Sequence, residues 1–144
     1  MQFFGLALFL LTFFPQTHAW CDIGQVDTIV LCYDAYMQAF GLPSLLNAAF
    51  FPPYLFVDQA RREYLTKGGP DYLAKVCSAN TDLYNCMIGV VQKDCMEMSV
   101  IDGAEYWMDM YASYYQCTKG YAIWEKDFAC INDARDKNLN DLRV

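Results

Sequence analysis

The sequence predicts an all-α fold, a single bundle of five or six helices crosslinked by disulfides. Apolar residues recur at spacings of three and four along the chain, which is the period of a helix with one buried face. Alternating strand patterns bounded by hairpin turns do not occur. Seven cysteines follow an apolar N-terminal leader, a combination typical of small secreted domains that rely on disulfides for stability.

Residues 1–19 are predicted to be a signal peptide. An apolar run of 12 residues is followed by Pro15 and by Thr17-His18-Ala19, which resembles a small-residue cleavage site. The run is shorter than the roughly 20 residues that a membrane-spanning helix needs, and no later segment is apolar for longer. We therefore expect secretion, no membrane span, a mature start at Trp20 and one cysteine-rich domain over residues 20–144.

The charge of the chain argues against polyanionic partners. All 10 Lys and Arg and all 17 Asp and Glu residues follow the leader, so the net charge of −7 belongs to the mature domain. Affinity for nucleic acid and for anionic lipid depends on cationic contacts to phosphates. No nucleic-acid partner is expected.

The first helix is predicted over Gln25–Phe40 and ends at Gly41-Leu42-Pro43. Its apolar residues, at spacings of three and four, are Val26, Ile29, Val30, Tyr33, Met37 and Phe40. A short helix could follow within Pro43–Phe50. Pro52-Pro53 then imposes an extended bend.

A second long helix is predicted over Leu55–Leu65, with a stop at Gly68-Gly69-Pro70. The segment Asp71–Gln92 is predicted to form two helices. Thr81 is the proposed N-cap of the second, because its hydroxyl can accept a hydrogen bond from a free amide of the first turn.

The last two helices are predicted over Ser99–Cys117 and from Tyr121 to about Asn138, separated at Lys119-Gly120. Residues 133–144 become polar and charged, so we expect this tail to fray. The series Asp136-x-Asn138-x-Asn140 imitates the start of a calcium loop, but a loop of that kind needs glycine where Asp141 stands. We interpret it as polar tail.

All seven cysteines are disulfide candidates: Cys21, Cys32, Cys77, Cys86, Cys95, Cys117 and Cys130. Cys77, Cys86 and Cys95 are nine residues apart, which on one helix means about 13 Å of rise, against a limit near 7 Å between bridged Cα atoms. We therefore predict that none of them pairs with its sequence neighbour. Cys117 and Cys130 could pair across the turn at Gly120.

An odd number of cysteines leaves one without an intrachain partner. That thiol could be free, could form a disulfide-linked dimer, or could have lost its partner with a missing C-terminal segment. No Cys-x-x-Cys pair occurs, whereas zinc sites favour such close pairs. The cysteines are interpreted as structural, and no metal or cofactor is expected.

Catalysis is not expected. The single histidine, His18, lies in the leader, so a Ser-His-Asp or Cys-His arrangement has no imidazole in the mature domain. Asp102, Glu105 and Asp109 could share one helix face, and glycoside hydrolysis needs only two carboxyl groups. We interpret them as a solvated acidic face.

Aromatic residues crowd one helix in numbers that a single buried stripe does not absorb. Ordinary core packing is the favoured interpretation. The alternative is a ligand pocket, whose candidate residues are Trp107, Tyr111, Tyr114 and Trp124.

The cysteine order resembles a known group of proteins. Cys21 and Cys32 are separated by ten residues, Cys77 stands in Leu73-x-x-x-Cys77, and the last cysteine stands in Phe128-x-Cys130. This order resembles the secreted multi-cysteine helical domains of nematodes, families of unknown function that usually have eight cysteines and whose relatives include chondroitin proteoglycan core proteins. No serine here is followed by glycine, the acceptor that a glycosaminoglycan chain requires.

The even intervals between Cys77, Cys86 and Cys95, after a gap of 44 residues, also resemble insect odorant-binding proteins. These are small, acidic, six-helix carriers. Their signature has a cysteine where this chain has Thr28, and they finish soon after the cysteine matched to Cys95.

Together these observations predict a secreted extracellular binding or structural module without catalysis, acting on an unidentified extracellular protein. The alternative function is a carrier of a small hydrophobic ligand.

Overall fold

A computed structural model describes residues 21–141 of the chain, so the predicted signal peptide lies outside the described residues. Within them every regular element is helical, which confirms the all-α fold. There are seven α-helices and one short 3₁₀ helix: α1 (Ile23–Gln38), η1 (Leu45–Asn47), α2 (Tyr54–Gly68), α3 (Pro70–Met87), α4 (Lys93–Ser99), α5 (Gly103–Thr118), α6 (Tyr121–Lys126) and α7 (Phe128–Asp141).

Helix α1 forms where the periodicity predicts it. Asp22 caps its N-terminus by accepting a hydrogen bond from the Gln25 amide at 2.9 Å. Ile29, Tyr33 and Met37, four residues apart, are almost fully buried and make its core face.

Helix α3 corrects the prediction of two helices over Asp71–Gln92. It is a single helix that starts with Pro70 in its first turn and ends before Gly89, whose φ is +79°. Thr81 lies inside it and is not an N-cap. The buried stripe that includes Leu73, Val76 and Leu83 continues past Thr81, so core packing overrides the local capping preference.

Two further boundaries differ from the prediction. Helix α4 was not predicted, and it follows the turn that ends α3. The helix predicted from Tyr121 to about Asn138 is broken at Asp127, whose φ and ψ of −102° and 19° separate α6 from α7. Helix α7 runs through most of segment 133–144, where fraying is predicted, and residues 142–144 lie outside the described part.

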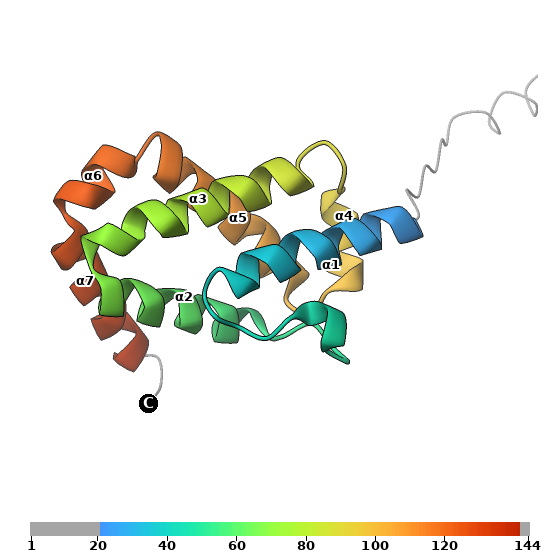
Figure 1. Cartoon of the computed structure of the whole chain (residues 1–144), viewed down its shortest axis with the longest axis horizontal. Helices are drawn as coiled ribbons and strands as arrows, with labels where there is room; N and C mark the ends of the chain where they lie inside the picture. Colours follow the sequence, from blue (N-terminus) through green and yellow to red (C-terminus); the bar gives the residue numbers. More distant parts are fainter. Residues whose placement is uncertain (1–20, 142–144) are drawn as a thin grey trace, which may run out of the picture.

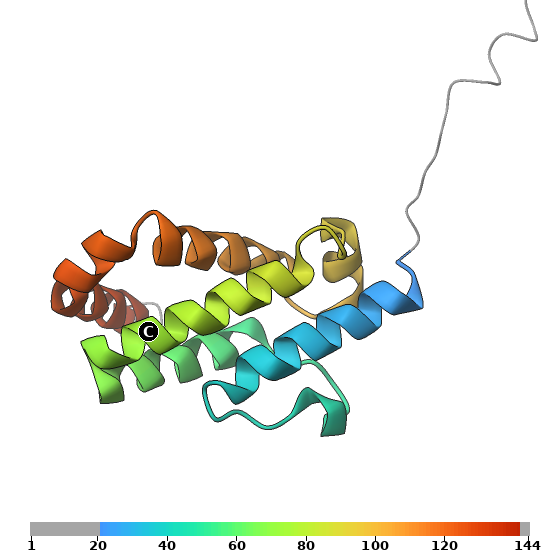
Figure 2. The ribbon, with the colours of Figure 1, turned by 45° about the horizontal axis from the view of Figure 1, so that its top comes forward.

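Helix α3 lies at the centre of the molecule and packs against α1, α2 and α5. Figures 1 and 2 show α1 and α3 side by side and running in opposite directions, with α4 at one end of the molecule and α6 and α7 at the other. The core between these helices is one contiguous apolar cluster.

Three disulfides join the helices. They pair Cys21 with Cys95, Cys32 with Cys86, and Cys77 with Cys117, and they leave Cys130 free and exposed. The prediction that Cys77, Cys86 and Cys95 avoid their sequence neighbours is confirmed.

The suggested Cys117–Cys130 pair is wrong, because the packing of α5 on α3 brings the Cα atoms of Cys117 and Cys77 to 5.0 Å. The helix-rise argument applies to Cys77 and Cys86, which share α3. It does not apply to Cys95, which lies on α4 beyond a turn.

In the part of the chain that the structure describes, no helix combines the length and the apolar character needed to cross a membrane.

Candidate functional site: a groove between α1 and α3

A buried cluster of charged and hydroxyl side chains surrounds Arg61 in the core. The Arg61 guanidinium, on α2, is 3% exposed and donates to Asp58 at 2.7 Å and to Asp109 at 2.7 Å. It also donates to the Tyr36 hydroxyl at 3.1 Å and to the Ser113 hydroxyl at 3.0 Å. We call these five residues the Arg61 cluster. It joins α1, α2 and α5 through the core.

The electrostatics of the Arg61 cluster favour a permanently charged arginine. Burial lowers the Arg61 pKa, but the neighbouring Tyr36, Asp109 and Asp58 oppose this and raise it above its ordinary value. Burial raises the pKa of Tyr36 to about 12. Arg61 therefore stays charged and Tyr36 stays neutral at neutral pH, which suits a structural role.

Asp102, Glu105 and Asp109, the carboxylates considered for a catalytic pair, have different surroundings. Asp109 is bound to Arg61. Asp102 stands at the N-cap position of α5 and accepts a hydrogen bond from the Tyr54 amide at 3.0 Å, and Glu105 is exposed in the first turn of α5. Each therefore has a different local environment.

The structure brings together three of the four aromatic residues proposed for a pocket. Tyr114 stacks on Tyr84 of α3 with ring centroids 3.8 Å apart, Tyr111 meets the same ring edge-on at 5.4 Å, and Trp107 contacts Tyr111 at 5.4 Å. Tyr84, Tyr111 and Tyr114 thus form part of the contact between α5 and α3, and Trp107 adjoins them on α5. Stacked and edge-on rings of this kind belong to packing.

The fourth, Trp124, lies on α6 and is buried. It lines a separate hollow of about 380 Å³ together with Gln116, Gly120, Ile123 and Ile131. Its indole N–H is buried without a hydrogen-bond partner in the structure.

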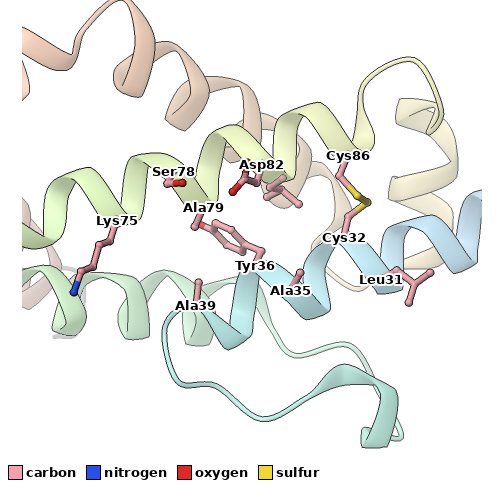
Figure 3. Close-up of a pocket in the computed structure, with 11 residues that line it drawn as sticks. Leu31, Cys32, Ala35, Tyr36, Ala39, Lys75, Ser78, Ala79, Asp82 and Cys86 are labelled. Atoms are coloured by element: carbon pink, nitrogen blue, oxygen red, sulfur yellow. A yellow bond between two sulfur atoms is a disulfide. The ribbon is translucent and has the colours of Figure 1, made fainter.

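A groove between α1 and α3 is a candidate binding site (Figure 3). Its volume is about 480 Å³, within the range of about 300–1,000 Å³ found for small-molecule sites. The lining residues are Leu31, Cys32, Ala35 and Tyr36 from α1, its C-cap residue Ala39, and Lys75, Ser78, Ala79, Asp82, Leu83 and Cys86 from α3. We call it the α1–α3 groove.

Small side chains create the α1–α3 groove. Ala39 on one wall lies opposite Ala79 on the other, and Ala35 and Ser78 are also small, so little side chain rises above the two helix backbones. The buried Tyr36 ring lies between the walls. Because the Tyr36 hydroxyl is held by Arg61, the Arg61 cluster fixes the position of this ring.

The two ends of the groove differ in chemistry. Figure 3 shows the Cys32–Cys86 disulfide at one end, where it crosslinks the walls with a Cα–Cα distance of 5.9 Å. Lys75 lies at the other end, with its Nζ 4.5 Å from the centre of the Tyr72 ring. Asp82 lies between them on the α3 wall. The site is thus a crosslinked, mainly apolar trough with one basic end.

The sequence prediction missed both the groove and the Arg61 cluster. Arg61 stands four residues after Val57 and four before Leu65, both buried, so a charge on the apolar face of a predicted helix was the available signal. Alanines four residues apart at positions 35 and 39 were the corresponding signal for the groove. Neither signal shows which other helix packs against these residues.

Among the described residues no group of three or more His, Cys, Asp or Glu side chains is placed to hold a metal ion. Comparison of the chain with known protein families, with curated proteins and with solved structures finds no match.

Proposed function

We propose that this protein is a secreted extracellular binding module without catalytic activity, and that the α1–α3 groove is its binding surface. The observation that carries the proposal is the groove itself: its two walls belong to helices that a disulfide crosslinks. A site held in its bound shape before binding loses less conformational entropy when the ligand arrives.

The extracellular part of the proposal is supported by the disulfides. Three intrachain bridges form and persist in oxidising compartments. They agree with the interpretation of residues 1–19 as a signal peptide. The resemblance to nematode secreted domains remains a prediction of the cysteine order.

The non-catalytic part is supported by how the carboxylates are used. Asp109 neutralises Arg61 and Asp102 bonds the start of α2, so neither is a free acid or base beside the other. Asp82 is the carboxylate that lines the groove. Single exposed carboxylates seldom catalyse reactions without a perturbed partner.

A specific observation also favours the second candidate function, a carrier of a small hydrophobic ligand. The volume of the groove suits a small molecule, and most of its lining is apolar. The aromatic cluster on α5, which first suggested a carrier, is packed against Tyr84 and does not support it.

The test uses the folded, oxidised protein and the neutral fluorescent probe N-phenyl-1-naphthylamine. Ala35→Phe places a ring in the groove from an exposed position of α1, and Ala112→Phe places the same ring on the exposed face of α5. We expect probe binding to be lost with Ala35→Phe and kept with Ala112→Phe. Equal binding by both variants, or none by the wild type, would contradict the proposal.

A further inference from the structure

We propose that the α1–α3 groove takes a single-chain amphiphile with one carboxylate, its head group at Lys75 and its chain lying toward the Cys32–Cys86 disulfide. This inference rests on the proposed function of the groove and adds the chemistry and the orientation of the ligand. It is argued from the charge, length and polarity of the lining.

The head group is assigned by charge. Lys75 is the basic residue among the eleven that line the groove, and it stands at one end. The Tyr72 ring holds its ammonium group there by a cation–π contact. Because the chain carries a net charge of −7, an anion is repelled over most of the surface and attracted at such a point.

The expected length and shape of the ligand follow from the lining residues of α3. Lys75 and Cys86 are eleven residues apart on one helix, which corresponds to about 16 Å of rise. Between them the alanines and Leu83 offer apolar surface along the groove, and Leu31 extends it at the disulfide end. An extended aliphatic chain matches the length of this path.

Asp82 adds selectivity. It lies about two helical turns from Lys75, on the same wall, and it is exposed. A monocarboxylate bound at Lys75 places only methylene groups beyond Asp82. A dicarboxylate of the same length would place its second carboxylate beyond Asp82, at an end of the groove where no cation lines it. Repulsion between this carboxylate and Asp82 opposes binding.

The experiment compares probes with the same aliphatic chain, below their micelle concentrations, by isothermal titration calorimetry. Dodecanoate carries an anionic head, dodecanol a neutral head and dodecyltrimethylammonium a cationic head. We expect the wild type to bind dodecanoate about fivefold more tightly than dodecanol, the size of an exposed ion pair, and the cation most weakly. The preference should weaken at high salt.

Variants locate the head group. Lys75→Gln should bring dodecanoate to the affinity of dodecanol and leave dodecanol unchanged, while Lys67→Gln, an exposed lysine on α2, should change neither. Asp82→Asn should strengthen binding of dodecanedioate by a larger factor than binding of dodecanoate. Both groove positions are exposed, so circular dichroism should show an unaltered fold.

The outcomes separate this inference from the function on which it rests. Equal affinities for dodecanoate and dodecanol, with both lost in Ala35→Phe, would overturn the assigned head group and keep the groove as a binding site. A carboxylate preference that survives Lys75→Gln would also overturn it. Failure of every probe, including the neutral dye, would overturn both proposals.

Discussion

At the scale of single residues, the stability of this domain depends on a few buried polar groups with specific partners. Arg61 balances two carboxylates from different helices in the core, and Asp34 holds the loop after α1. A buried charge is tolerated only when it is paired and hydrogen-bonded. Removing Arg61 therefore takes from Asp58 and Asp109 the cation that they share, although Arg62 still contacts Asp58 at 3.0 Å.

Arg61→Met is expected to destabilise the fold by about 3–5 kcal/mol, because Asp58 and Asp109 would keep their charges without a central cation. Urea unfolding followed by circular dichroism measures the loss. Lys67→Met, an exposed change on the same helix, should stay within about 0.5 kcal/mol of the wild type. A similar small change for Arg61→Met would show that the cluster does not form in solution.

Asp34→Asn should lower stability at neutral pH and have no effect in strong acid. The Ser44 hydroxyl, together with the Leu45 amide and Gln38, holds the pKa of the Asp34 carboxyl below its ordinary value. A carboxyl with a lowered folded pKa adds stability above its unfolded pKa of about 3.8, and this is lost as the pH falls through the folded value.

Denaturant unfolding of both proteins across the acid range checks this expectation. Asp27→Asn, at an exposed position of α1, is the control. A wild-type advantage that stayed constant down to strong acid would contradict the role of the Asp34 charge.

At the scale of elements, close backbone contact joins helices in addition to the disulfides and the apolar core. Helices α4 and α5 show such contact at Gly103, where a Cβ atom would collide with the Met96 carbonyl oxygen and lie 2.8 Å from the Glu97 Cα. Backbone atoms at such distances leave no room for a side chain.

Gly103→Ala should therefore destabilise the protein by about 1–3 kcal/mol, since the two helices must separate to admit one methyl group. Thermal unfolding measures the effect. Gly24→Ala, where the nearest atom is a carboxylate oxygen of Asp22 at 3.2 Å, is the matched control and should not destabilise the protein to a similar degree. Equal destabilisation of both variants would show that the close approach at Gly103 does not explain the change, because replacing a helical glycine by alanine is otherwise stabilising.

Six of the seven cysteines form disulfides and one, Cys130, is free. In the folded, oxidised protein iodoacetamide should label Cys130 alone, because it is free and exposed. Cys130→Ser should leave stability within about 0.5 kcal/mol. Removing both Cys77 and Cys117 should cost about 4 kcal/mol, from the entropy of a loop of 40 residues.

Peptide mapping without reduction and denaturant unfolding test these statements. Label on any second cysteine of the folded protein would contradict the pairing. A band of twice the mass on a non-reducing gel that disappears in Cys130→Ser would show that this thiol also links two chains.

At the scale of the whole molecule, tyrosine rings connect the helices. Tyr33 contacts Tyr36, Phe51 and Tyr106 edge-on, with ring centroids between 5.1 and 6.0 Å apart. The Tyr33 hydroxyl donates to the Tyr106 carbonyl at 3.1 Å, and the Tyr106 hydroxyl donates to that of Pro52 at 3.0 Å. These rings place hydroxyl groups inside the core, where ionisation is unfavourable.

Alkaline pH should accordingly unfold the protein. Burial raises the pKa of Tyr33, and that of Tyr36 to about 12, both from an ordinary value of 10.0. Groups with a raised folded pKa add stability below the unfolded pKa, and this is lost as the pH rises from about 10 through the folded value. Tyrosinate absorbance should thus rise in a late step that coincides with loss of helix.

The same titration in denaturant, where every tyrosine is exposed, should show one early step. Ionisation of all tyrosines in the native protein with the helical signal intact would contradict the buried network.

The sequence by itself determined the elements whose information is local. The helix over Gln25–Phe40 and the stop at Gly41 depend on residues within four positions of one another, and periodicity reads that range. The prediction that Cys77 and Cys86 do not pair is confirmed, but the sequence also predicted a helix break at Thr81 between them, so it did not determine the single helix that carries both. Thr81 shows the limit: a residue suited to a cap lies inside a helix when core packing favours continuation.

Only the tertiary structure decided which distant segments meet. The three bridges join residues 40 to 74 positions apart, and Arg61 meets Asp109 across 48. No spacing rule connects such residues, because their contact depends on which helix faces pack together. The α1–α3 groove is the clearest case: taken singly, Ala39 and Ala79 carry no binding signal in the sequence, and the groove exists only because antiparallel packing sets them opposite one another.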